Sequence, residues 1–307
     1  MKTECMRGNP VSYIKPNTEI ESKRFSCRTF LKEPLKEETR RRLVEFMSLI
    51  TTGPFGNRAR FELVAATEQD RETLRHLGTY GFIKGATGFI VGAVAEADKD
   101  LEDFGYLMES IVLFATDLGL GSCWLGGTFT KSSFAERISV GRGESLPAVI
   151  AVGMMAPTPR RVDSIIRLGI RADRRLPWKR LFFDGGFRVP LSREAAGEYA
   201  VPLEMVRLGP SASNRQPWRI IRDVTSSQSG WHFYLQRSRR YGGGAIGGLL
   251  GSADLPRIDV GIALCHFELT AGELGLKGRW EVEEPQIEKP DAPTEYIATW
   301  VGADVGR

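Results

Sequence analysis

Apolar residues recur along this chain at two spacings, and each spacing predicts one kind of element. From Asp103 to Leu118 the apolar side chains fall three and four residues apart, which places them on one face of a helix that Gly119 ends. Short apolar runs bounded by turn residues indicate strands instead. Helices are expected over residues 36–52, 69–77, 103–118, 192–208 and 259–274, and strands over residues 61–67, 88–95, 148–155, 218–224, 231–236 and 296–302.

The segments between these elements carry residues that end or interrupt regular structure. Ser192 is a favourable N-cap residue, and Pro202 is expected to break or kink the helix that follows it. Residues 1–20 are polar and unpatterned, which predicts an arm or a frayed end. Residues 184–186 are expected to form a linker, and the glycine-rich residues 239–254 a surface loop.

The second half of the chain repeats the first at a fixed offset. A shift of 156 residues superposes eight identities within twenty-four positions, and the same shift places Gly53-Pro54 on Gly209-Pro210. A spacing preserved at two separate places indicates an internal duplication. The identical pairs are Asp103/Asp259, Gly105/Gly261, Leu113/Leu269, Ala115/Ala271, Leu118/Leu274, Gly119/Gly275, Leu120/Leu276 and Trp124/Trp280.

Candidate chemistry is concentrated in a loop between a predicted helix and a predicted strand. In this serine/asparagine loop (residues 209–217), Ser211, Ser213, Asn214 and Gln216 crowd hydrogen-bonding side chains and backbone amides together. Such a loop suits a flat ligand with polar edges, although an ordinary serine-rich turn has the same composition. A second candidate is the arginine segment (residues 24–28), whose arginines bracket a serine and suit a phosphate.

These two motifs resemble those of the FMN-dependent nitroreductase family. The order Gly-Pro-Ser-Ala-Ser-Asn-x-Gln-Pro-Trp resembles its flavin-contacting loop, and Arg-x-Ser-x-Arg resembles its N-terminal phosphate motif. The resemblance implies an α+β fold of mainly antiparallel sheets flanked by helices. Because the chain is duplicated, it resembles the tandem members of the family, in which two halves form an intramolecular pseudo-dimer. The expected halves are residues 21–186 and 187–307.

The resemblance also implies a role for each matching residue. Arg24, Ser26 and Arg174 or Arg175 would hold the FMN phosphate, and Arg28 and Lys84 would lie near N1 and the C2 carbonyl of the flavin. Gly126 and Gly127 would offer backbone amides near N5, whereas Trp124 would pack rather than react. The remaining expected FMN contacts are Phe25, Leu125, Pro210, Ser211, Ala212, Ser213, Asn214 and Gln216.

The motifs are divided unequally between the halves. The first half keeps the arginine segment and the basic pair Arg174-Arg175, but its own loop is reduced to Gly-Pro-Phe-Gly-Asn at residues 53–57. The second half keeps only the intact loop. Together the surviving motifs make one site, which predicts one FMN per chain between the halves. The expected reaction is a ping-pong hydride transfer from NAD(P)H to a nitroaromatic, a quinone or a similar small-molecule electron acceptor, for which no catalytic side chain is needed.

The composition of the chain bears on three other classes of protein: nucleic-acid binders, metal or disulfide proteins, and membrane or secreted proteins. The net charge of +4 over 307 residues is small for a dedicated nucleic-acid binder, although residues 160–180 carry eight basic and two acidic side chains. Four dispersed cysteines and three histidines show no metal-site or disulfide spacing, and His266 beside Cys265 is expected to pack within a helix. No apolar run is long enough to span a bilayer, and no signal peptide is evident, which predicts a soluble cytoplasmic protein.

Two alternatives remain open at this point. The chain could be a non-catalytic relic of the nitroreductase fold that serves as a flavin-binding or structural protein, or a basic nucleic-acid-binding module around residues 160–180. It is expected to be a monomer that acts as a pseudo-dimer, with further oligomerisation left open.

Overall fold

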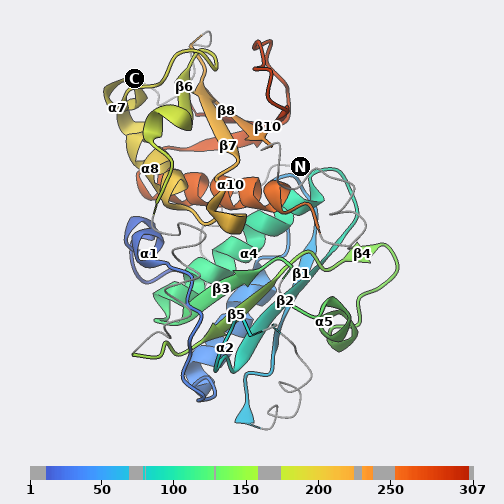
Figure 1. Cartoon of the computed structure of the whole chain (residues 1–307). Coiled ribbons are helices and arrows are strands. Elements are labelled where there is room, and N and C mark those ends of the chain that lie inside the picture. The colour runs from blue at the N-terminus through green and yellow to red at the C-terminus, as the bar shows by residue number, and fades with distance from the viewer. Residues whose placement is uncertain are drawn as a thin grey trace.

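A computed structural model describes residues 12–68, 79, 81–127, 129–157, 174–224, 230–237 and 253–303. Two sheets lie on opposite sides of a central pair of helices, α4 (Asp100–Asp117) and α10 (Leu255–Glu273) (Figure 1). The predicted α+β class with mainly antiparallel sheets is confirmed, because a single parallel strand pair occurs in the described residues. Within the described residues, no helix is both long and apolar enough to cross a membrane.

The first sheet is antiparallel and has the order β1-β2-β5-β3, with β4 also paired to β2. Strand β2 lies inside this sheet, and its sequence is a continuous apolar run because both faces of the sheet are covered there. Ile90 and Val94 face the core formed with α2 and α4, whereas Phe89 and Val91 face the core that includes Phe134 of α5. The elements are α2 (Glu37–Leu49), β1 (Ala59–Val64), β2 (Gly88–Ala95), β3 (Gly121–Leu125), α5 (Lys131–Arg137), β4 (Glu144–Ser145) and β5 (Val149–Gly153).

The second sheet has the order β6-β7-β8-β10-β9, in which β6 and β7 are parallel. Trp218 and Ile220 of β7 face the core formed with α8 (Ala200–Leu208) and α10, while Ile221 packs beside Tyr234 on the other face of the sheet. β6 therefore belongs to the second sheet, although its residues precede the sequence boundary expected at 186/187. The strands are β6 (Phe182–Asp184), β7 (Trp218–Arg222), β8 (Gly230–Gln236), β9 (Gly278–Glu281) and β10 (Thr294–Gly302).

Helices α4 and α10 cross where two equivalent glycines remove side chains from the interface. A Cβ atom on Gly105 would lie 2.3 Å from the carbonyl oxygen of Ile258, and one on Gly261 would lie 2.1 Å from that of Glu102. Both contacts obey the 156-residue offset, since 105 + 156 = 261 and 102 + 156 = 258. The two halves thus meet through reciprocal contacts, as the two identical surfaces of a two-fold dimer do.

Several sequence expectations are wrong in detail. Residues 17–23 form helix α1 (Asn17–Lys23) rather than an arm, because Ile20 packs beside Leu113 and Cys265; residues 1–11 lie outside the described part. Pro202 sits in the first turn of α8 (Ala200–Leu208), where proline is tolerated, so the interruption falls instead at Gly197, whose φ is 56°. The other short helices are η2 (Trp178–Arg180), α7 (Arg193–Ala196), η3 (Gly197–Tyr199) and η4 (Ala212–Asn214).

The remaining boundaries shift by a few residues or fall outside the described part of the chain. Ser192 caps α7 as predicted, since its hydroxyl accepts from the Ala195 amide at 3.1 Å. Helices α4 and α10 begin three and four residues earlier than expected. The helix expected at 69–77 and most of the glycine-rich loop at 239–254 lie outside the described residues.

Candidate functional site

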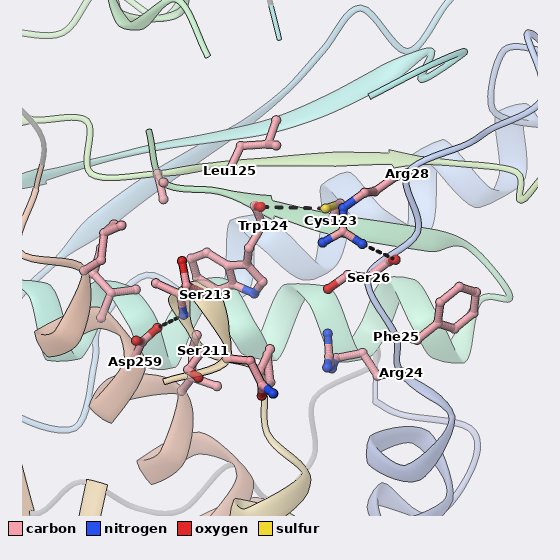
Figure 2. A pocket seen from close by; sticks show the side chains of 18 of the residues that line it. Arg24, Phe25, Ser26, Arg28, Cys123, Trp124, Leu125, Ser211, Ser213 and Asp259 are labelled. Atoms are coloured by element: carbon pink, nitrogen blue, oxygen red, sulfur yellow. Dashed lines mark hydrogen bonds between the residues drawn. The ribbon is translucent and has the colours of Figure 1, made fainter. Parts of the chain in front are cut away.

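A cavity of about 630 Å³ opens between the two halves of the chain. Its lining comes from the arginine segment, the end of β3, the serine/asparagine loop and one face of α10. These stretches are far apart in the sequence, and the cavity volume lies in the usual range for a small-molecule site. Figure 2 shows Arg24 and Ser26 on one side of the cavity, Trp124 in the middle, and Ser211, Ser213 and Asp259 on the other side.

The arginine segment runs extended out of helix α1 along the edge of β3. The Cys27 amide donates to the Ser122 carbonyl at 2.8 Å, which ties the segment to the first sheet. In an extended chain alternate side chains share a side, so Arg24, Ser26 and Arg28 all line the cavity from one stretch. Phe25 also borders the cavity, although its ring points away from Arg24 in Figure 2 and the residue is 45% exposed.

The serine/asparagine loop is held in a conformation that L-residues rarely adopt. Ser213, Asn214 and Gln216 have φ of 50°, 55° and 50°, in the left-handed region. The loop keeps this shape because its polar groups are tied internally and to neighbours: Ser211 Oγ accepts from the Gln216 amide at 2.8 Å, and Arg175 donates to the Asn214 side chain. Strained backbone that is held this firmly is typical of ligand-binding sites.

A buried carboxyl group anchors each copy of this loop to a central helix. Asp259 Oδ1 accepts from the Ala212 amide at 2.9 Å. In the first half, Asp103 accepts from the Phe55 and Asn57 amides at 2.9 and 2.8 Å, so both of its oxygens are used. Asp259 Oδ2 has no such partner among the described residues. Burial raises the pKa of Asp103 to about 6 and the pKa of Asp259 well above its usual range, against the effect of these amides.

An ionic cluster (Glu21, Arg24, Glu109 and His266) borders the cavity, and two of its members, Glu21 and Arg24, belong to the lining. His266 is fully buried, with Nε2 3.0 Å from Glu109 Oε1 and Nδ1 3.3 Å from Glu21 Oε2, the latter not aligned as a hydrogen bond. Burial alone would lower the pKa of His266, but the two carboxylates outweigh it and raise this pKa to about 9. His266 is therefore an imidazolium at neutral pH, and the expected packing role of this residue is an ionic one.

Thirteen of the sixteen residues expected to contact a cofactor line this cavity, and three do not. Lys84 pairs through its backbone with Arg28 and Phe30, and its side chain is exposed. Arg174 is exposed, and Gln216 is buried behind the loop, where it accepts from the Leu176 amide. The thirteen are Arg24, Phe25, Ser26, Arg28, Leu125, Gly126, Gly127, Arg175, Pro210, Ser211, Ala212, Ser213 and Asn214.

Sequence reasoning missed the contribution of helices α1 and α10. Glu21, Leu255, Ile258, Asp259 and Ile262 also line the cavity. The repeat offered one signal, because Asp259 is among its identical positions, but nothing in the residue spacing marked Glu21. Among the described residues, no group of three or more histidine, cysteine, aspartate or glutamate side chains could hold a metal ion.

Solved structures of other proteins are similar to this architecture. A putative nitroreductase from Thermotoga maritima MSB8 is 18% identical, with a TM-score of 0.55 over 97% of this chain and 99% of that one. A nitroreductase with bound FMN from Desulfitobacterium hafniense DCB-2 is 21% identical and covers 48% of this chain and 93% of its own, with a TM-score of 0.38. The search of curated proteins found no match.

The first of these likenesses confirms the predicted nitroreductase-like fold along nearly the whole chain. The family model described as "Putative TM nitroreductase" matches residues 18–271, which include both the arginine segment and the serine/asparagine loop. The resemblance inferred from those two motifs is thereby confirmed, and the chain belongs to this nitroreductase family.

Proposed function

We propose that this protein is an FMN-dependent oxidoreductase of the nitroreductase type, with one flavin site between its two halves. The observation that carries the proposal is the cavity itself. It brings the arginine segment of the first half and the serine/asparagine loop of the second into one lining. The residue order of each motif indicates flavin binding independently of this spatial relation between them.

The cavity residues fit an anionic, flat cofactor. Arg24, Arg28 and Arg175 supply three cations, and the Arg24 side chain is only 4% exposed, with no hydrogen-bond partner at Nε among the described residues. A buried guanidinium without a full set of partners is suited to an anion that enters the cavity. Gly127 has open space where a Cβ would be, so its backbone is accessible from the cavity.

Bound FMN would supply the redox chemistry, and the side chains would position it and stabilise its charge. Arg24, Ser26 and Arg175 would hold the phosphate, and Arg28 would stabilise the negative charge that the reduced ring carries. The serine/asparagine loop would contact the ribityl chain and the ring edge. Gly126 and Gly127 would present backbone amides to the ring.

We further propose that the two halves, expected as residues 21–186 and 187–307, form an intramolecular pseudo-dimer with a single working site, in which the end of the first stretch contributes β6 to the second sheet. The reciprocal contacts of Gly105 and Gly261 support the pseudo-dimer. At the place equivalent to the serine/asparagine loop, the reduced loop of the first half packs Phe55 against the core of the second sheet. Both carboxylate oxygens of Asp103 also accept hydrogen bonds from backbone amides of that loop. These contacts support a single working site per chain.

The reaction would be ping-pong, with NAD(P)H as the reductant and a nitroaromatic, a quinone or a similar electrophile as the acceptor. The alternative is a relic that keeps the fold without turnover, and visible spectroscopy separates the two. We expect the purified protein to bind FMN, to absorb as a flavoprotein, and to bleach when NADH or NADPH is added under nitrogen. A protein that takes up no added FMN would refute the proposal, and one that binds FMN without being reduced would favour the relic.

A further inference from the structure

The ionic cluster beside the cavity breaks the symmetry of the two halves, because equivalent positions of the repeat carry different side chains. The 156-residue offset relates Glu109 to Cys265 and Ser110 to His266. The Glu109–His266 pair therefore has a counterpart across the pseudo-two-fold relation, which is Cys265–Ser110. Those two side chains also touch, with Ser110 Oγ and Cys265 Sγ 3.3 Å apart. One pair of equivalent positions is ionic and the other is neutral.

The ionic pair is the one next to the cavity. Its neighbours Glu21, Arg24 and Trp124 all line the cavity. Cys265 instead packs in an apolar cluster with Ile20 and Leu113, which do not line the cavity. A buried ion pair is a costly way to hold two helices together, because each charge must be desolvated. Its retention on the cavity side alone points to a role in the site rather than in general packing.

Both oxygens of Glu109 are already bound by groups other than the arginine. Oε1 accepts from His266 at 3.0 Å, and Oε2 accepts from the Trp124 indole nitrogen at 2.7 Å. Arg24 Nε remains 3.7 Å from Oε1, too far for a hydrogen bond, although both side chains are almost fully buried. Glu109 thus attracts Arg24 electrostatically without forming a hydrogen bond to its Nε, and the guanidinium stays available on the cavity side.

We propose that His266 is a positioning residue that occupies Glu109 and so keeps Arg24 free to bind the anionic group of the cofactor. This inference rests on the proposed FMN site and assigns a role within it. Without the imidazolium, no histidine charge would balance the charge of Glu109, and Arg24, whose Nε lies 3.7 Å from Oε1, is the nearest remaining cation. The arginine would then pair with the carboxylate, and the cofactor phosphate would have to compete with Glu109 for it.

The test measures FMN and riboflavin affinity of the full-length apoprotein by flavin fluorescence titration. We expect His266→Gln to weaken FMN binding about tenfold or more, as for the loss of one charge-assisted hydrogen bond, and to leave riboflavin affinity unchanged because riboflavin has no phosphate. The double variant His266→Gln/Glu109→Gln removes the competing carboxylate as well and should recover most of the FMN affinity. Simple damage to packing would make the double variant worse.

A matched control lies one residue earlier in the same helix. Cys265→Ala changes an equally buried side chain of the neutral pair and should leave the affinity for both flavins as in the wild type. Equal FMN affinity in wild type and His266→Gln would overturn the inference, and so would parallel losses of FMN and riboflavin binding or a double variant without recovery. If the wild type itself binds no FMN, the proposed function fails first.

Discussion

At the crossing of α4 and α10, Gly261 lies so close to the backbone of α4 that a larger side chain there should destabilise the protein by an amount set by the interatomic distance. A methyl group at this position would lie 2.1 Å from the Glu102 carbonyl oxygen. Cβ atoms essentially never lie closer than 3.0 Å to such a neighbour, so the helices would have to separate by roughly 1 Å. The obstructing atom belongs to a helix backbone and cannot rotate away. Gly261→Ala should therefore carry the cost of overpacking, about 1–3 kcal/mol or more.

Helix propensity acts in the opposite direction and provides the control. Alanine is favoured over glycine inside a helix by about 1 kcal/mol. Gly272 lies in the same helix, and a Cβ atom there would meet no atom of the described residues within 4 Å. We expect Gly272→Ala to stabilise the protein by about 0.5–1 kcal/mol, and Gly261→Ala to destabilise it by about 2 kcal/mol.

Urea unfolding followed by circular dichroism measures both changes. Gly105→Ala should resemble Gly261→Ala, because its methyl group would lie 2.3 Å from the Ile258 carbonyl. One separation of the helices relieves both clashes, so the double variant should lose less stability than the sum of the single losses. A Gly261→Ala protein as stable as Gly272→Ala would show that the helices do not cross as closely as described.

Two further predictions concern buried titratable groups. The pKa of His266 is raised to about 9 in the folded protein. The protonated histidine therefore contributes its full stabilisation below pH 6.5, and this stabilisation is lost as the pH rises through 9. Urea unfolding across this range should show a loss of up to about 3 kcal/mol in the wild type and no such loss in His266→Gln. Asp103→Asn should lower the stability of the protein by about 1–3 kcal/mol, because an asparagine side chain cannot accept from both backbone donors. Asp259→Asn has a single donor to satisfy and should leave the stability nearly unchanged in the same unfolding assay. Equal losses in the two variants would contradict this difference.

Much of the architecture could be predicted from local patterns. β2 was recognisable because both of its faces are buried, which makes its sequence a continuous apolar run. The loop at residues 209–217 was recognisable because its residue order resembles the flavin-contacting loop of the nitroreductase family. The repeat was visible because helix packing constrains Gly105 and Gly261 in the same way.

The contributions that depend on distant contacts were not predictable from the chain alone. Helix α1 is short and polar, and its burial depends on Ile20 reaching α4 and α10. Lys84 was assigned to the site from family resemblance, but the backbone pairing of its segment leaves the side chain exposed. The ionic role of His266 depends on two carboxylates from other helices, which no spacing along α10 could indicate.

If two unlike halves build one flavin site, the FMN content of the protein will show it. The protein would be saturated with FMN, freed of excess by gel filtration and denatured, and the released FMN would be compared with the protein concentration. We expect one FMN per chain. A ratio of two would contradict it, because it would mean that the position occupied by Phe55 and its loop also binds flavin.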